Sequence, residues 1–305
     1  MYQWRINRRD FLRQAGVAGL TLTALPALLE ACGASPSGGT GTASTLDQAK
    51  KAGVIRVGFA NEAPYAYADS SGKLTGEAPA VATAIMAELG IPKLEGVLTE
   101  FGALIPGLLA NRFDIIAAGM FITPKRCAQI LFSNPDYVAT EALAVKAGNP
   151  LKLSDYASIA KNSSAIAGAE TGAVEGDLMK QSGIPADRLQ VFPNGPTGMQ
   201  AVLSGRIHAF SLTAISLEYL IKTGGFTGLE VTAPFVPVIN GKKQIGAGGY
   251  GFRKTDADFL AQFNAKLASL QQSGKVASLV DPFGFKGETV SAAQGLTSAE
   301  LCKAS

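Results

Sequence analysis

Apolar and polar positions repeat along this chain with two different periods, and the two kinds of segment alternate. Compact apolar runs predict strands, whereas apolar residues spaced three or four apart predict helices. In the first half we expect strands at residues 54–59, 94–98 and 113–117, with helices at 80–89 and 102–110 between them. Strands that alternate with helices in this order predict a parallel sheet with right-handed crossovers.

The same alternation returns in the second half of the chain. The expected strands and helices there are residues 164–168, 174–181, 189–192, 197–204, 209–212 and 215–223. The chain then returns through 229–233 and a glycine-rich run at 245–252 to a long amphipathic helix at 256–273, which Gly274 closes.

This order predicts an α/β fold of two lobes. Lobe 1 is expected to comprise residues 46–142 and 244–305, and lobe 2 residues 143–243. Two crossings, expected near 143–146 and 236–243, would form a hinge, and a ligand belongs in the cleft at the strand ends.

Residues 1–31 are typical of an export signal rather than of a folded domain. Arg8 and Arg9 begin a twin-arginine pattern, and an apolar stretch follows at 15–29. A membrane anchor is the alternative, but this stretch is shorter than the roughly 20 residues that a span needs. The tetrad Leu-Glu-Ala-Cys ending at Cys32 resembles a lipobox, which predicts lipidation of Cys32. Residues 32–45, rich in glycine, serine and threonine, predict a flexible tether.

Charge and cysteine content narrow the function. The whole chain has 27 basic and 24 acidic residues. Without residues 1–31 it has 23 and 22, so no basic excess indicates nucleic acid. Besides Cys32, two cysteines remain, and such a pair in an exported protein favours a Cys127–Cys302 disulfide over a metal site. The chain has one histidine, so we expect no metal and no cofactor.

The most informative segment is LIPGLLANRFDIIAAGMFITPKRC, residues 104–127. A buried strand is expected in it, followed by a helix that Thr123 caps and Pro124 begins. Arg126 lies on the first turn of that helix. A guanidinium beside free backbone N–H groups suits a carboxylate. The alternative is a surface arginine in an ordinary strand–helix unit.

This segment resembles the core of the family 3 solute-binding proteins, which deliver polar amino acids and related solutes to ABC importers. The resemblance extends at lower density over residues 54–275. It implies a two-lobed periplasmic-binding-protein-like fold, a small-molecule ligand and a membrane permease as partner. Together with the export signal, the lipobox and the tether, it predicts an extracytoplasmic location and no enzymatic activity. In the family the matching arginine binds the α-carboxylate of the ligand, which assigns that role to Arg126.

Two positions depart from the amino-acid-binding members of the family. Phe121 stands where they have Ser or Thr, and Thr213 stands where they have the Asp that binds the α-ammonium. An α-ammonium would then be poorly compensated in a dry cleft. The sequence therefore disfavours a general amino-acid receptor.

Aromatic residues are expected around the cleft instead. Tyr65, Phe101 and Phe121 all lie in loops at strand ends, although core packing is the alternative for each. With Glu62 and Arg126 they suit a zwitterion that has a delocalised cation and a carboxylate. GEAP at residues 76–79 and the run that starts at Gly119 resemble the ectoine/hydroxyectoine-binding proteins. The expected ligand is therefore ectoine or hydroxyectoine.

The second lobe is expected to contribute a strand-to-helix turn. Backbone N–H groups at Thr171, Ala173 and Val174 would meet the ligand, and Thr213 would bond a neutral ring group. Either feature is equally explained as a helix N-cap. Two other functions stay open: an amino-acid or opine-type receptor, and a cyclohexadienyl dehydratase-like enzyme for which Glu62 is the only obvious acid.

Overall fold

The computed structural model describes residues 43–303. The expected signal, Cys32 and most of the expected tether lie outside these residues. No helix in the described part of the chain has the length and apolarity needed to cross a membrane.

The first sheet carries the three strands expected in the first half, and they are parallel. Its order is β4-β1-β5-β15-β6, and β7 also pairs with β15. The strands are β1 (Val54–Phe59), β4 (Lys93–Leu98), β5 (Ile115–Phe121), β6 (Leu131–Phe132), β7 (Tyr137–Ala139) and β15 (Gly246–Phe252). β15 is antiparallel to β5, because the chain re-enters from the second sheet at the end where β5 finishes. The parallel arrangement expected for the three strands of the first half is confirmed for β1, β4 and β5.

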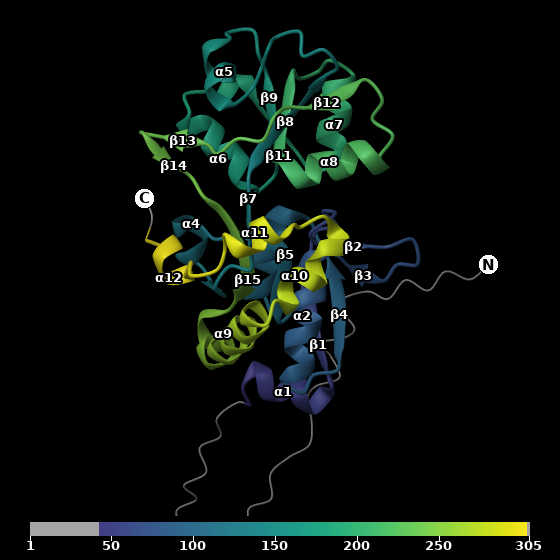
Figure 1. The fold of residues 1–305 in the computed structure, drawn as a ribbon, viewed down its shortest axis with the longest axis vertical. Helices are drawn as coiled ribbons and strands as arrows, with labels where there is room; N and C mark the ends of the chain where they lie inside the picture. Colours follow the sequence, from purple (N-terminus) through teal and green to yellow (C-terminus); the bar gives the residue numbers. More distant parts are fainter. Residues whose placement is uncertain (1–42, 304–305) are drawn as a thin grey trace, which may run out of the picture. The chain divides into compact units, whose positions relative to one another are not determined.

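Helices and one hairpin surround this sheet, and together they form lobe 1. In Figure 1 the yellow C-terminal helices cover the same sheet as the purple and blue N-terminal elements. The elements are α1 (Thr45–Ala52), α2 (Glu77–Glu88), α3 (Leu104–Leu109), α4 (Pro124–Cys127), α9 (Ala257–Gln272), α10 (Lys275–Val280), α11 (Gly287–Ser291), α12 (Ser298–Leu301), β2 (Tyr67–Ala68) and β3 (Leu74–Thr75). Ile55, Ile85 and Phe263 are completely buried between them. The expected helix at 102–110 is a 3₁₀ turn, Phe101–Ala103, followed by α3.

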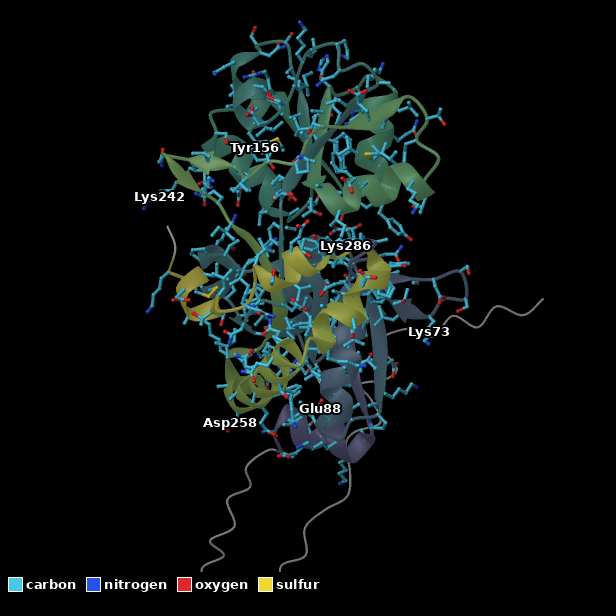
Figure 2. All side chains as sticks on the ribbon, in the orientation of Figure 1. Lys73, Glu88, Tyr156, Lys242, Asp258 and Lys286 are labelled. Carbon is cyan, nitrogen blue, oxygen red and sulfur yellow. A yellow bond between two sulfur atoms is a disulfide. The ribbon has the colours of Figure 1, made fainter. Side chains whose placement is uncertain are left out.

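The second sheet, with order β10-β9-β11-β8-β12, forms lobe 2. Its strands are β8 (Glu141–Lys146), β9 (Ala167–Glu170), β10 (Leu189–Phe192), β11 (Ala209–Thr213) and β12 (Leu229–Val231). Its helices are α5 (Tyr156–Lys161), α6 (Val174–Gln181), α7 (Gly195–Leu203) and α8 (Ala214–Thr223). β9 pairs in parallel with β10 and with β11. β8 pairs antiparallel with β11 on one side and with β12 on the other. Tyr156, labelled in Figure 2, is buried in this lobe, and its hydroxyl bonds the Ser211 hydroxyl at 2.9 Å.

The chain crosses between the sheets twice. The first crossing is at Thr140, between β7 and β8, and not at 143–146 as expected. Residues 141–145 pair with β11 and so belong to the second sheet. The second crossing contains a hairpin of β13 (Val238–Ile239) and β14 (Lys242–Lys243), on which Figure 2 labels Lys242. The two crossings bond each other, since the N–H groups of Glu141 and Phe235 each donate to the other's carbonyl at 2.9 and 2.8 Å.

A disulfide joins α4 to the C-terminal tail. The sulfur atoms of Cys127 and Cys302 are 2.03 Å apart and close a loop with a sequence separation of 175. α12 precedes Cys302 and begins with a capping box between Thr297 and Glu300. The helix that carries Arg126 is therefore linked covalently to the end of the chain.

Candidate ligand-binding site

Hydrogen bonds and one cation–π contact hold Arg126 in place. The Thr123 hydroxyl accepts the Arg126 backbone N–H at 3.3 Å, which fixes the first turn of α4. The guanidinium lies 5.3 Å over the Phe101 ring. Its Nη1 donates to the Phe121 carbonyl at 2.7 Å, and its Nη2 donates across the lobes to the Gly172 carbonyl at 3.0 Å.

This guanidinium is a buried cation without an anion beside it. Arg126 is 7 % exposed, and burial lowers its pKa to about 10. Among the described residues, no carboxylate oxygen lies within 4.0 Å of its nitrogens. A buried charge without a partner is costly, so this position favours an anionic group on a ligand.

Glu62 follows β1 and faces lobe 2. Its Oε1 accepts the Ser216 hydroxyl of α8 at 2.8 Å. The pKa of the Glu62 carboxyl is raised to about 7, mainly by desolvation and in smaller part by the charge of Glu175. The Ser216 hydrogen bond and the charge of Arg126 act in the opposite direction. Glu62 therefore titrates near neutral pH.

The expected aromatic residues reach the site, but they do not form a free-standing box. Tyr65 is 1 % exposed, and its ring packs 5.1 Å from both Tyr137 and Phe285. Phe121 lies 6.2 Å from the Tyr137 ring, and the Phe101 face is already covered by Arg126. Core packing therefore positions these rings, and only part of each remains for a ligand.

The absence of a side chain at Gly119 leaves room for the Tyr65 ring. A Cβ on Gly119 would stand 2.3 Å from the Tyr65 ring, and the φ of Gly119 is +63°. A side chain there would be both strained and overlapping. The Tyr65 hydroxyl, held in this way, donates to Thr213 Oγ1 at 3.2 Å across the cleft.

Lobe 2 contributes the opposite wall. Ala173 and Val174 line it where α6 begins. Thr213 also lines it, and its hydroxyl oxygen accepts from Tyr65 and, at 3.4 Å, from the N–H of Ser216 as the cap of α8. Thr171 does not line the cavity, because its backbone N–H and its hydroxyl both donate to the Phe192 carbonyl, at 2.8 and 3.0 Å.

Together these residues line one small, partly open cavity of about 20 Å³, which is about the room that a single water molecule needs. Its lining comprises Glu62, Tyr65, Phe101, Gly119, Phe121, Arg126, Ala173, Val174, Glu175, Leu212 and Thr213. All residues expected from the sequence are present except Thr171. Glu175 and Leu212 were not expected. Glu175 gave only the signal of an acidic helix start, which usually faces solvent. No group of three residues of metal-binding type is positioned to hold an ion in the described part of the chain.

Residues 55–286 match the profile of the bacterial extracellular solute-binding proteins, family 3. The chain belongs to this family. It is 34 % identical to the probable amino-acid ABC transporter periplasmic-binding protein y4tE of Sinorhizobium fredii, over 85 % of this chain and 86 % of that protein. It is 27 % identical to the lysine/arginine/ornithine-binding periplasmic protein of Escherichia coli, over 72 % of this chain and 83 % of that protein.

Among solved structures, the fold of this family 3 protein resembles that of EhuB in complex with hydroxyectoine. The TM-score is 0.78 and the identity 38 %, covering 85 % of this chain and 98 % of EhuB. Members of family 3 are extracytoplasmic, and these relatives are substrate-binding proteins rather than enzymes. A small-molecule ligand and permease subunits of an ABC transporter follow as partners.

Proposed function

We propose that this family 3 protein binds a zwitterion of the ectoine/hydroxyectoine type for import. Arg126 takes the ligand carboxylate, and Glu62 takes the cyclic amidinium. The observation that carries the proposal is the pairing of a buried, anion-free guanidinium with a partly buried acid, Glu62, in one small cavity. The likeness to EhuB, solved with hydroxyectoine, supports the same ligand class.

A delocalised cation suits the remaining surfaces better than an α-ammonium does. The Thr213 oxygen, at the strand end where amino-acid receptors have an acid, already accepts two hydrogen bonds. Tyr65 and Phe121 present parts of their rings to the cavity. A planar cation gains from aromatic faces, by about 0.5–2 kcal/mol at each contact.

The proposal includes the route and the anchor. A twin-arginine signal at residues 1–31 exports the protein, lipid on Cys32 holds it at the outer face of the membrane, and the 32–45 tether lets it reach the permease. The two lobes, with limits close to those expected from the sequence, close on the ligand and present one surface to the permease.

A cationic amino acid is the second candidate, and Glu175 is the observation that favours it. Of the described residues that line the cavity, this is the one acid from lobe 2 that an α-ammonium could meet. The relative that binds lysine, arginine and ornithine belongs to the same family. We propose no catalytic role for either candidate.

The test is calorimetric titration of the mature protein with ectoine, hydroxyectoine, L-arginine, glycine betaine and prephenate. We expect saturable binding of ectoine or hydroxyectoine, no binding of betaine and no turnover of prephenate. Binding of L-arginine alone would favour the second candidate. Turnover of prephenate would contradict a pure binding function.

A further inference from the structure

The lobe 2 wall contains a buried acid to which the proposed contacts give no role. Glu175 is the second residue of α6, is 3 % exposed and lines the cavity. Its Oε2 has no hydrogen-bond donor among the described residues. Glu62 approaches the same cavity from lobe 1. One carboxyl group of each lobe therefore borders the space for the ligand.

Glu141 stands behind Glu175. It is the first residue of β8, is 2 % exposed, and its Oε2 also lacks a donor. Burial raises the pKa of both carboxyl groups, and each group shifts the pKa of the other, that of Glu141 upward and that of Glu175 downward. A proton on Glu141, shared with Glu175, would give both carboxyl groups a hydrogen-bond partner. Glu141 is then the neutral donor, and Glu175 is the charged acceptor that borders the cavity.

Among the described residues, no cation lies within 4.0 Å of this acceptor, although the charge of Arg126 acts on it from a greater distance. Glu62, Arg126, Glu141, Glu170 and Tyr137 are the titratable groups that act on the site from both lobes. Of the described residues that line the cavity, Arg126 is the one cation, and no carboxylate lies within 4.0 Å of it. The cavity therefore offers two acids that a ligand cation can compensate.

The ordinary role of an acid at a helix start is filled by another residue. Asp177 is in the same first turn of α6, its side chain is 45 % exposed, and it bonds Lys125 at 2.6 Å. An acid that only stabilises the helix dipole has no need to be buried against a cavity. The burial of Glu175 thus calls for a different explanation.

We propose that Glu62 and Glu175 form a two-acid clamp, with one carboxylate from each lobe, for the opposite N–H edges of a planar cation. Amidinium and guanidinium groups present such edges, whereas a quaternary ammonium has no N–H to donate. The clamp rests on the proposed function and specifies its ligand class. Glu141 is a positioning residue, because it acts only through Glu175. Since the acids belong to different lobes, the clamp is complete only when the lobes meet.

The experiment compares Glu175→Gln with Glu218→Gln by titration with ectoine and with L-arginine, which carry an amidinium and a guanidinium. Glu218 is exposed on α8 in the same lobe, so it matches the loss of charge without lining the cavity. We expect Glu175→Gln to weaken binding by at least about tenfold and Glu218→Gln to change it less than about twofold.

Glu141→Gln tests the positioning role, because an amide N–H can replace the shared proton as donor to Glu175. We expect it to bind within about threefold of the parent, whereas Glu141→Leu, which has no donor, follows Glu175→Gln. A merely structural role for Glu141 would give equal losses in both variants, and that result would overturn its part in the clamp.

The outcomes separate the clamp from the proposed function. If the parent binds ectoine and Glu175→Gln binds it equally well, the clamp is overturned and the proposed function stands. If the parent binds L-arginine and not ectoine, the proposed ligand is wrong, Glu175 is then assigned to the α-ammonium as in the second candidate, and the clamp is overturned. If the parent binds neither probe, or binds glycine betaine instead, the clamp is overturned.

Discussion

The two walls of the cleft are built differently. The lobe 1 wall holds its charges and rings in place by packing within that lobe: Phe101 and the Phe121 carbonyl fix Arg126, and Gly119 makes room for Tyr65. The lobe 2 wall is mainly small or apolar and adds one acid, Glu175. Lobe 1 is therefore preorganised for recognition, and lobe 2 completes the site by closing on it.

Three hydrogen bonds link the walls. Tyr65 donates to Thr213, Ser216 to Glu62, and Arg126 to the Gly172 carbonyl. Each joins a residue of the lobe 1 wall to an end of a helix or strand in lobe 2. When the lobes close, lobe 2 therefore contacts the same side chains that are proposed to bind the ligand. We expect lobe closure and ligand binding to be coupled for this reason.

The largest expected effect comes from removing the lobe 1 anchor. In Arg126→Ala the ligand carboxylate loses its charge-assisted partner, which costs about 2–5 kcal/mol and lowers affinity from about thirtyfold to several thousandfold. Titration calorimetry measures this, and Arg112→Ala, an exposed arginine of the same lobe, is the control. A folded Arg126→Ala protein with the affinity of the parent would refute the anchor.

The next prediction tests whether the disulfide between Cys127 and Cys302 holds the lobe 1 anchor in place. Cys302→Ser opens the loop that the disulfide with Cys127 closes, and we expect a loss of about 2–4 kcal/mol in the free energy of unfolding. Because Cys127 follows Arg126 on α4, amide hydrogen exchange should rise in α4 and not in α6. Denaturant titration gives the first quantity. An equal rise in both helices would mean that the disulfide stabilises the whole protein rather than the anchor.

A smaller effect isolates closure. A Cβ on Gly172 would stand 2.5 Å from the Gly102 Cα in the other lobe, so Gly172→Ala should hinder the lobes from meeting. Gly183 has the same kind of backbone, with φ +89° against +83°, but nothing within 4 Å of its Cβ. Both substitutions strain the backbone by about 1–3 kcal/mol, but only Gly172→Ala should weaken binding, by about tenfold.

Small-angle scattering with saturating ligand supplies the second readout for this pair. The radius of gyration of Gly172→Ala should remain above that of the parent, whereas that of Gly183→Ala should match it. Equal affinities and equal radii for the two variants would show that the Gly102–Gly172 contact does not limit closure.

The same contrast between lobes governs what the sequence could predict. The lobe 1 residues follow apolar strands of clear period, and Thr123-Pro124 is a strong helix start, so Arg126 could be placed from local patterns alone. In lobe 2 the main strands and helices from residue 164 onward were also expected within a few residues, whereas α5 was not expected. The directions of its side chains were not, because they depend on tertiary contacts.

Thr171 and Glu175 illustrate this limit. Gly172, with φ +83°, turns the backbone between β9 and α6, and the Thr171 hydroxyl is directed to Phe192 instead of the cavity. Glu175 reads as an ordinary helix-start acid until Glu141 is seen beside it. The first crossing was misplaced for a similar reason, since residues 141–145 join the second sheet only through their pairing with β11.

The smallest expected effect is a dependence of ligand affinity on pH, which involves an acid from each wall of the cleft. Burial, together with the charge of Glu175 from lobe 2, raises the pKa of Glu62 in lobe 1 to about 7. A ligand cation favours the charged carboxylate, so binding expels a proton, and affinity should increase from pH 6 to pH 8, by at most about tenfold for each unit below the pKa. At pH 7, calorimetry in two buffers of different ionisation enthalpy should detect this released proton.

Glu62→Gln removes the titrating group and should flatten the dependence of affinity on pH, whereas Glu218→Gln should retain it. If the affinity of the parent is the same at pH 6 and pH 8, Glu62 does not face the cation, and recognition of the cation would then rest on lobe 2 alone.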